Sequence, residues 1–245
     1  MNAMMKVSAI IFDVDGLMLD TECMARIAWL RVMAELGYDF PEQVYRNIVG
    51  ITVADAERYL YEKFGRDFPF EEAYRRKQRY VQEAIQEQGI PLKPGLSELL
   101  EALDGSDQAL HVDPVKDSPA VENAALTGHH WLKAVASSSS GEIVRRNLKA
   151  AGLPAGSFDA IVGGEEVRKG KPAPDIYLLV SERLEVKPSS CLVLEDSNPG
   201  IKAVHAAGMI PVMIPDLIPP DEEARVMAYR ILPDLHAVTR LILHV

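Results

Sequence analysis

The sequence predicts an α/β fold: a doubly wound parallel sheet with a helical domain inserted after its first strand. Short apolar segments with the length and β-branched content of buried parallel strands recur along the chain. Several of them end in acidic or hydroxyl side chains and are followed by segments with helical spacing. Residues 21–89 contain no convincing strand and have helical spacing instead.

The first apolar segment, Val7–Phe12, leads into Asp13, Asp15 and Gly16. Because side chains alternate along a strand, the two carboxylates point to the same side. There they repel each other unless a cation or a shared proton offsets the repulsion. Gly16 allows a sharp turn close to a ligand. One carboxylate could be a nucleophile and the other an acid/base, with a divalent cation between them. A strand followed by an ordinary Asp-Gly turn would give the same pattern.

The inserted region is expected to be helical because apolar residues such as Ile27, Leu30 and Met33 recur at helical spacing. Its Met and aromatic residues are interpreted as core rather than as cofactor ligands. A Pro- and Gly-rich segment, 89–95, returns the chain to the sheet domain. The predicted domains are residues 1–19 with 90–245, and residues 20–89. The helices predicted here are 22–36, 41–49, 53–64, 70–88 and, after the return, 96–103.

A second apolar segment ends in Ser137 and Ser138 and precedes a helical segment, 142–152. Hydroxyls and free backbone N–H groups between the end of a strand and the start of a helix suit a phosphate. Alternatively, the serine run serves only to cap the helix, which Ser139 or Ser140 could do.

Lys171 stands before two closely spaced prolines, Pro172 and Pro174, and a predicted helix, 175–184. The prolines make this turn stiff. A lysine fixed beside carboxylates can neutralise a phosphoryl oxygen. The alternative is a solvated surface lysine, which is where most lysines are found.

A third apolar segment, 191–194, ends in Glu195 and Asp196, and a turn then leads to a predicted helix, 201–207. Carboxylate oxygens of this kind suit Mg²⁺, which takes one or two carboxylates together with waters and phosphate oxygens. Alternatively, the acids could cap the helix or complement its dipole.

These motifs occur in order, and all except the lysine fall at the carboxyl end of a candidate parallel strand, the edge at which open α/β sheets bind ligands. Together they resemble the haloacid dehalogenase superfamily, in its β-phosphoglucomutase-like branch. The resemblance covers nearly the whole chain except 105–130 and implies a Rossmann-like core with an inserted helical cap. The matching motifs are Asp13-Val14-Asp15-Gly16, Ser137, Lys171 and Glu195-Asp196, together with the phrases Gly-Lys-Pro-Ala-Pro-Asp and Leu-Glu-Asp-Ser-x-x-Gly.

The resemblance implies catalytic roles for the residues of the first and third motifs. Asp13 would attack phosphorus and form an aspartyl-phosphate, and Asp15 would protonate the leaving alcohol and then deprotonate the attacking water. Lys171 would stabilise the phosphoryl group.

The resemblance also implies a metal and phosphate site. Mg²⁺ would be held by Asp13, the main-chain carbonyl of Asp15 and Asp196, with Glu195 orienting a metal-bound water or sharing in ligation. The phosphoryl oxygens would be bound by a second set of residues: Ser137, the Ser138 amide, Lys171 and the turn at Gly16.

The implied function is a Mg²⁺-dependent phosphatase acting on a small phosphomonoester, such as a sugar or polyol phosphate. The first alternative is a β-phosphoglucomutase-type mutase. Mutases of this family use a histidine soon after the first motif and a basic cap residue, where this chain has Ala25 and Val53. A non-catalytic binding protein is a further alternative, and a dehalogenase is disfavoured because Asp15 is present. Basic cap residues that could substitute in a mutase are Arg58, Arg75, Arg76 and Lys77.

Composition excludes several classes of protein. The 245 residues are 48% hydrophobic and 25% charged, as in soluble globular enzymes. A net charge of −10 argues against nucleic acid or an anionic membrane as partner. With no apolar segment of membrane-spanning length and no signal peptide, a cytoplasmic monomer or weak homodimer is expected. Cys23 and Cys191 suggest neither a disulfide framework nor a zinc site.

Residues 104–130 depart from the family pattern. They are polar, lack clear periodicity and hold three of the six histidines. His129 and His130 could form a metal site with Asp113 and Asp117, but a surface loop at the sheet edge opposite the active site is the preferred interpretation. Because long structureless loops are uncommon inside compact domains, a partner-binding insertion or a locally disturbed sequence stays open.

Overall fold

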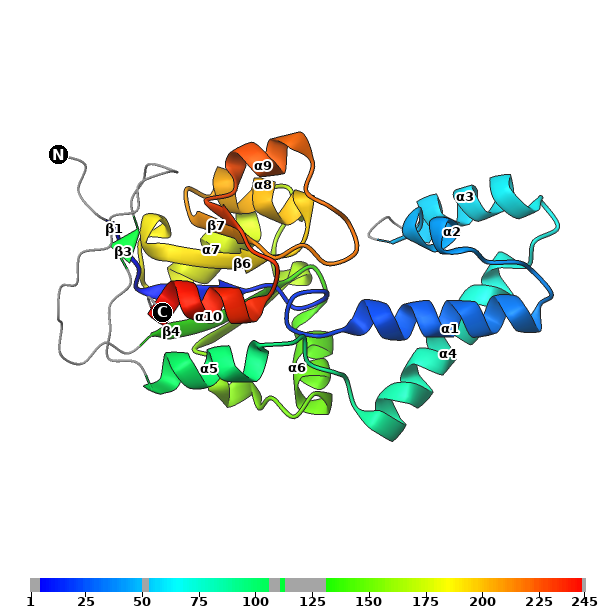
Figure 1. Ribbon diagram of the computed structural model, residues 1–245, viewed down its shortest axis with the longest axis horizontal. Helices are drawn as coiled ribbons and strands as arrows, with labels where there is room; N and C mark the ends of the chain where they lie inside the picture. The colour runs from blue at the N-terminus through cyan, green and yellow to red at the C-terminus, as the bar shows by residue number, and fades with distance from the viewer. Residues whose placement is uncertain (1–4, 50–52, 106–110, 113–130, 244–245) are drawn as a thin grey trace. The chain divides into compact units, whose positions relative to one another are not determined.

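The computed structural model describes residues 5–49, 53–105, 111–112 and 131–243 (Figure 1). The chain divides into two compact units: a sheet unit, Met1–Leu19 with Leu92–Val245, and a helical unit, Asp20–Pro91. The helical unit therefore ends two residues beyond the predicted boundary at residue 89.

The main sheet is parallel, and in its described part the strand order is β5-β4-β2-β6-β7-β8. The chain runs from β2 outward through β4 to β5, and then crosses to the other side of β2 for β6, β7 and β8. The point at which the direction reverses therefore lies at β2, beside β4 and β6. The strands are β2 (Ala9–Phe12), β4 (Leu132–Ser137), β5 (Ala160–Gly163), β6 (Cys191–Glu195), β7 (Ile210–Met213) and β8 (Arg230–Ile231).

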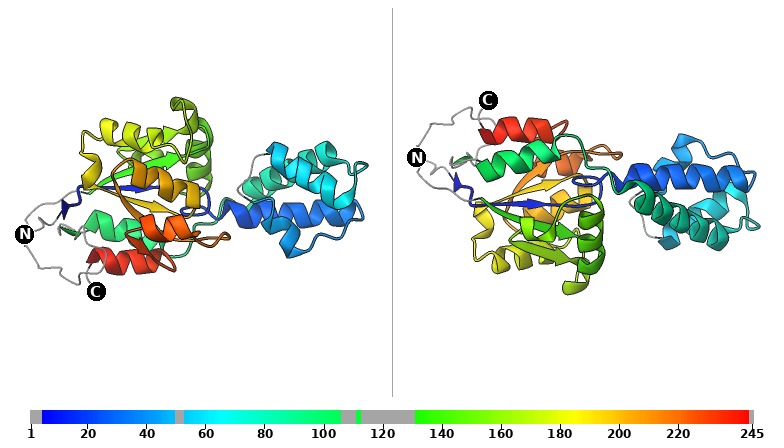
Figure 2. Two further views of the ribbon diagram at one scale, coloured as in Figure 1. Left: turned by 90° about the horizontal axis from the view of Figure 1, so that it is seen from above. Right: turned by 90° about the horizontal axis from the view of Figure 1, so that it is seen from below.

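Helices cover both faces of this sheet. α7 (Asp175–Arg183) and α8 (Asn198–Ala206) pack on the face that carries Ile11, Ala134 and Val193. α5 (Leu96–Gly105) and α10 (Leu235–Leu243) lie side by side on the opposite face (Figure 2). Because both faces are covered, the central strands are almost entirely apolar, apart from Lys133 in β4 and the polar residues at the strand ends. The predicted doubly wound α/β core is confirmed. The sheet unit also contains α6 (Gly141–Ala150), α9 (Glu222–Met227) and the 3₁₀ turns Ala155–Ser157, Gly164–Glu166 and Pro188–Ser190.

The helical unit is the predicted insertion between β2 and β4. α1 packs along α4, and an aromatic cluster fills its interior. The Trp29 and Phe40 rings stack with centroids 6.0 Å apart, and the Trp29 and Tyr74 centroids are 6.5 Å apart. The aromatic residues interpreted as core thus pack against one another. The helices are α1 (Thr21–Glu35), α2 (Glu42–Arg46), α3 (Val53–Phe64) and α4 (Phe70–Gln88).

The two chain segments next to the unit boundary pair with each other through the main chain. In the sheet unit, Leu19 and Leu92 form an antiparallel bridge, and the Lys93 N–H donates to Met18 O at 2.9 Å. The turn before them is closed by the Gly16 N–H, which donates to Leu19 O at 3.0 Å. Gly16 has φ of +87°, a conformation that favours glycine.

Several details differ from the sequence prediction, among them the second helix of the helical unit, which spans Glu42–Arg46 rather than 41–49. His111–Val112 forms a short strand, β3, antiparallel to β1 (Met5–Lys6), at the end of β2 opposite Asp13. Each of these strands has only two residues, which is too short for a periodic side-chain pattern to reveal it. The candidate metal site of Asp113, Asp117, His129 and His130 lies outside the described residues. The helix predicted from 201 begins at Asn198, because the Ser197 side chain caps it.

None of the described helices is long and apolar enough to cross a membrane.

Candidate active site

The predicted site residues lie at the carboxyl ends of three neighbouring strands. Asp13 follows β2, Ser137 ends β4, and Glu195 ends β6. Lys171 reaches them from the connection between β5 and α7, at a cis peptide bond to Pro172. This edge, beside the reversal of strand order, is where open α/β sheets bind ligands.

Lys171 links two of these carboxylates. Its Nζ lies 2.5 Å from Asp13 Oδ1 and 2.5 Å from Glu195 Oε1. The Lys171 side chain is only 7% exposed, so it is not the solvated surface lysine of the alternative interpretation. Asp13 Oδ2 receives no hydrogen bond from the described residues, which leaves this oxygen available for a ligand.

Glu195 is completely buried, and all its hydrogen bonds are directed inward. Besides Lys171, the Tyr177 hydroxyl donates to Oε1 at 2.7 Å. The Ser197 N–H and Oγ donate to Oε2 at 3.0 Å and 2.9 Å. Both Glu195 oxygens thus accept hydrogen bonds from protein donors, and the metal role of Glu195 stays a prediction. The contact with Glu195 holds Lys171 Nζ beside Asp13.

Three residues support Glu195 without having been predicted as site residues, although two of them, Ser197 and Gly200, belong to the Leu-Glu-Asp-Ser-x-x-Gly phrase. Tyr177 lies in the first turn of α7, Ser197 caps α8, and Gly200 lies in the first turn of α8. A Cβ at Gly200 would overlap the Glu195 carboxyl group, so only glycine fits there. The segment Ser197-Asn-Pro-Gly is a helix start, and this signal could have indicated Ser197 as the cap.

The buried charges at Lys171 are unbalanced, because one cation serves two anions. Burial would lower the pKa of Lys171, but Asp13 and Glu195 raise it well above its usual value, so it stays protonated. Burial would raise the pKa of Glu195, but Lys171 and the other hydrogen bonds lower it below its usual value. Burial raises the pKa of Asp13 to about 7, against the opposing effect of Lys171. The negative charge that Lys171 does not balance therefore falls on Asp13, where its raised pKa shows that the charge is disfavoured. A cation bound beside Asp13 would offset this charge.

The second acid and the serine run lie together. The Ser139 hydroxyl donates to Asp15 Oδ2 at 3.3 Å, and the Ser139 N–H donates to Ser137 Oγ at 3.0 Å. Ser137 is 1% exposed, whereas Ser138 is exposed. Ser140 caps α6 through Ile143 N–H, which leaves the preceding serines for other roles. Ser139 was missed as a partner of Asp15 because it was considered only as a cap.

The residues present fit a hard cation. Asp196 has no hydrogen bond or ion pair with the described residues, and burial, together with Asp13 and Glu195, raises its pKa well above the usual value. A Cβ at Gly16 would overlap Asp196 Oδ2 and lie 3.5 Å from Asp216 Oδ2. Asp216 Oδ2 is buried without a hydrogen-bond partner. Oxygen atoms that face one turn and lack donors suit Mg²⁺.

Asp13, Asp196 and the Asp15 main-chain carbonyl would hold such a cation. Across the described ranges, no three His, Cys, Asp or Glu side chains form a closed metal cluster. The predicted metal residues also include Glu195. Without Glu195 the set has two carboxylates and one main-chain carbonyl, which is enough for Mg²⁺ because this ion keeps several of its waters.

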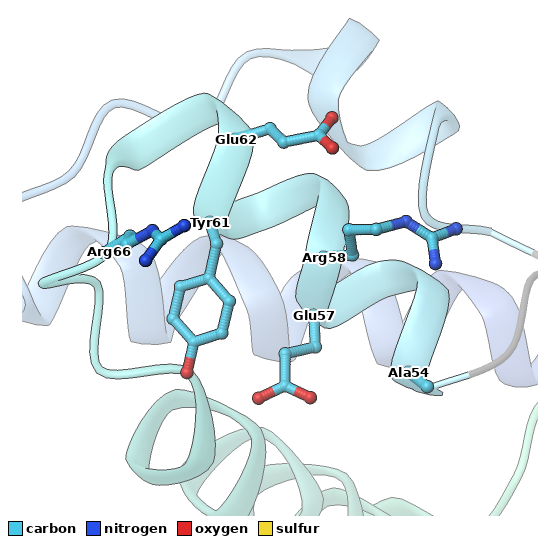
Figure 3. A pocket seen from close by; sticks show the side chains of 6 residues that line it. All are labelled: Ala54, Glu57, Arg58, Tyr61, Glu62 and Arg66. Atoms are coloured by element: carbon cyan, nitrogen blue, oxygen red, sulfur yellow. The ribbon is translucent and has the colours of Figure 1, made fainter.

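The helical unit has a separate pocket on α3, which contains none of the predicted catalytic residues (Figure 3). Arg58 lies 2.5 Å from Asp55, so the charge of this basic residue is already paired. The pocket is lined by Ala54, Glu57, Arg58, Tyr61, Glu62 and Arg66.

Comparison with known proteins identifies the family. The model of the haloacid dehalogenase-like hydrolases matches residues 7–208. The chain belongs to this family. It is 32% identical over 213 residues to a Drosophila melanogaster protein named "Probable pseudouridine-5'-phosphatase", covering 86% of this chain and 83% of the relative. It is 30% identical over 210 residues to the phosphorylated carbohydrates phosphatase of Thermotoga maritima, covering 82% of each chain.

A solved structure supports the same assignment. CbbY from Rhodobacter sphaeroides, crystallised with phosphate, superposes with a TM-score of 0.67 at 28% identity, covering 94% of this chain and 95% of CbbY. The resemblance inferred from the motifs and the predicted enzyme class, a hydrolase of this family, are therefore confirmed.

We predict that Gly200→Ala destabilises this hydrolase by ~1–3 kcal/mol, because the new methyl group displaces Glu195 from Lys171. Helix propensity alone would favour alanine here. Gly105→Ala is the control, since Gly105 is also helical and no described residue lies within 4 Å of an added Cβ. Urea unfolding should show a loss for Gly200→Ala and none for Gly105→Ala. An equal loss of stability at both positions would contradict the overlap of the added methyl group with the Glu195 carboxyl group.

Metal-free protein should lose stability between pH 5 and pH 8. Because the pKa of Asp13 is about 7 in the folded state and near 3.8 when unfolded, its contribution is complete below pH 4 and is lost as the pH rises through 7. Asp13→Asn removes this titration. Urea unfolding in EDTA should show wild type losing about 2 kcal/mol relative to Asp13→Asn over this range. If the free energy of unfolding changes equally with pH in the two proteins, the raised pKa of Asp13 is excluded.

Proposed function

We propose that this hydrolase is a Mg²⁺-dependent phosphatase of a small phosphomonoester, and that Asp13 is its nucleophile. The observation that supports this best is Lys171, buried and held 2.5 Å from both Asp13 and Glu195. Lys171 fixes Asp13 Oδ1, and Asp13 Oδ2 receives no hydrogen bond from the described residues. A positioned carboxylate of this kind is what covalent phosphoryl transfer needs.

In the first chemical step, Asp13 Oδ2 attacks phosphorus. The new Oδ2–P bond forms as the bond from phosphorus to the alcohol oxygen breaks, and protonated Asp15 gives its proton to that oxygen. The Ser139 hydroxyl, 3.3 Å from Asp15 Oδ2, holds the Asp15 side chain for this transfer. The products of this step are the free alcohol and an aspartyl-phosphate on Asp13.

In the second step, a water attacks the phosphorus of the aspartyl-phosphate. Asp15 takes a proton from this water, the Oδ2–P bond breaks, and inorganic phosphate is released with Asp13 restored. Asp15 thus ends in the protonated state in which it began. General acid/base assistance of this kind is typically worth ~10²–10⁴ in rate.

The phosphoryl oxygens need donors, since charge stabilisation and positioning are most of phosphoryl-transfer catalysis. Lys171 supplies a cation, and its raised pKa keeps it protonated in the catalytic pH range. Ser137 accepts from the Ser139 N–H and so keeps its own hydroxyl proton to donate. The Ser138 amide is the third donor of the proposal. Mg²⁺, when bound by Asp13, Asp196 and the Asp15 carbonyl, supplies charge neutralisation between nucleophile and phosphate.

A sugar or polyol phosphate is the proposed substrate class, because relatives are named for phosphorylated carbohydrates and pseudouridine 5'-phosphate. The phosphomutase alternative needs a histidine and a basic residue for a second phosphate, and Ala25 and Val53 provide neither. The basic residues that could substitute are largely paired within the helical unit: Arg58 with Asp55, and Arg75 and Arg76 with Glu72.

Phosphate release from a panel of phosphorylated metabolites tests the proposal. Wild type should hydrolyse at least one sugar or polyol phosphate with Mg²⁺ and none in EDTA. Asp13→Asn should lose turnover while still unfolding cooperatively, because a missing nucleophile removes the reaction path. Activity in EDTA, or turnover by a folded Asp13→Asn protein, would refute the mechanism. Glucose 6-phosphate formed from β-glucose 1-phosphate faster than phosphate release would favour the mutase.

Asp15→Asn should separate substrates by their leaving group. The variant keeps the main-chain carbonyl of residue 15 but cannot protonate the alcohol. We expect kcat to fall ~10²–10⁴-fold for alkyl phosphates and much less for 4-nitrophenyl phosphate, whose leaving group needs no proton. Equal losses on both substrates would remove Asp15 from the acid role.

A further inference from the structure

One buried carboxylate near the site has no role in the steps above. Asp216 lies in the connection after β7, and this connection is fixed to the site because the Ile214 N–H donates to Glu195 O at 2.7 Å. The main chain therefore places Asp216 close to the Glu195-Asp196 pair. Its side chain is 14% exposed.

The two oxygens of Asp216 have different surroundings. Oδ1 accepts from Lys93 Nζ at 2.6 Å. Lys93 is itself fixed, because its N–H donates to Met18 O beside the Leu19–Leu92 bridge. Oδ2 is buried and has no hydrogen-bond partner. The ion pair thus orients the carboxylate and leaves one oxygen unused.

The unused oxygen faces the acids of the site. It lies 3.5 Å from the position of a Cβ on Gly16, a position that would also overlap Asp196 Oδ2. Two carboxylates that face one glycine turn repel each other, and a buried acceptor without a donor is costly. A hydrated cation at this turn would remove both penalties, since its charge offsets the repulsion and its waters are donors.

We propose that Asp216 is a positioning residue of the Mg²⁺ site, with Oδ2 as the outer acceptor beside Asp196 and Lys93 as the residue that orients it. This inference rests on the proposed Mg²⁺ dependence. It assigns Lys93, in the segment that returns from the helical unit, to the support of the metal site. Outer acceptors of this kind typically change metal affinity 10–100-fold when they are removed.

Mg²⁺ binding measured by calorimetry on metal-free protein, without substrate, tests the role of Asp216. Asp216→Asn should raise the Kd for Mg²⁺ about tenfold or more. Asp221→Asn is the matched control: Asp221 lies in the same connection, caps α9 through Ala224 and pairs with Lys202. It undergoes the same charge change, and asparagine also caps helices, so its Kd should stay within about twofold of wild type.

Urea unfolding of the same proteins separates positioning from a purely structural role. If Asp216 only anchors Lys93, Asp216→Asn will lower stability and leave the Kd for Mg²⁺ unchanged, which overturns the inference. Should Asp216→Asn not unfold cooperatively, Asp216→Ser is used for the comparison. Wild type that binds no Mg²⁺ would refute the proposed metal dependence and this inference together. Wild type that binds, with unchanged variants, refutes the inference alone.

Discussion

The site depends on one buried cation shared by two carboxylates. Lys171 reaches both Asp13 and Glu195 at 2.5 Å, and its charge is sufficient for only one of them. Glu195 has further donors in Tyr177 and Ser197, so Asp13 is left with the unbalanced charge. The carboxylate proposed as nucleophile is therefore oriented by Lys171 but not neutralised by it. This imbalance favours the second cation, Mg²⁺, that the proposed function places beside Asp13.

The strand order of the sheet is sufficient to bring Asp13, Ser137 and Glu195 together. Reversal of strand order at β2 places the ends of β4 and β6 on either side of Asp13. α8 then starts from Ser197, which donates to Glu195 and accepts from the Gly200 N–H at 3.1 Å. The start of the helix and the support of the buried acid are thus one hydrogen-bonded unit. A substitution in α8 that moves Ser197 would therefore shift Glu195, and through Lys171 it would also shift Asp13.

Much of this could be predicted from the sequence because the strand segments are mostly apolar and end in polar residues. The order of Asp13, Ser137, Lys171 and Glu195 indicated both the edge of the sheet and the chemistry. The direction of the Glu195 side chain could not be predicted, since it depends on Tyr177 and on the space that Gly200 leaves. Asp216 has no neighbouring motif, and only the fold brings it close to Asp196. β3 has only two residues, too few to show an alternating side-chain pattern.

The Leu19–Leu92 bridge has a consequence for the modular design of the chain. Both crossings to the helical unit leave the sheet unit as adjacent, hydrogen-bonded backbone. A short hairpin turn could join these residues directly, because antiparallel neighbours need only about two to five linking residues. The two backbone segments that flank the insertion are therefore already hydrogen-bonded to each other within the sheet unit. Helical inserts of other lengths could be exchanged at this point with little loop-closure entropy cost to the sheet unit.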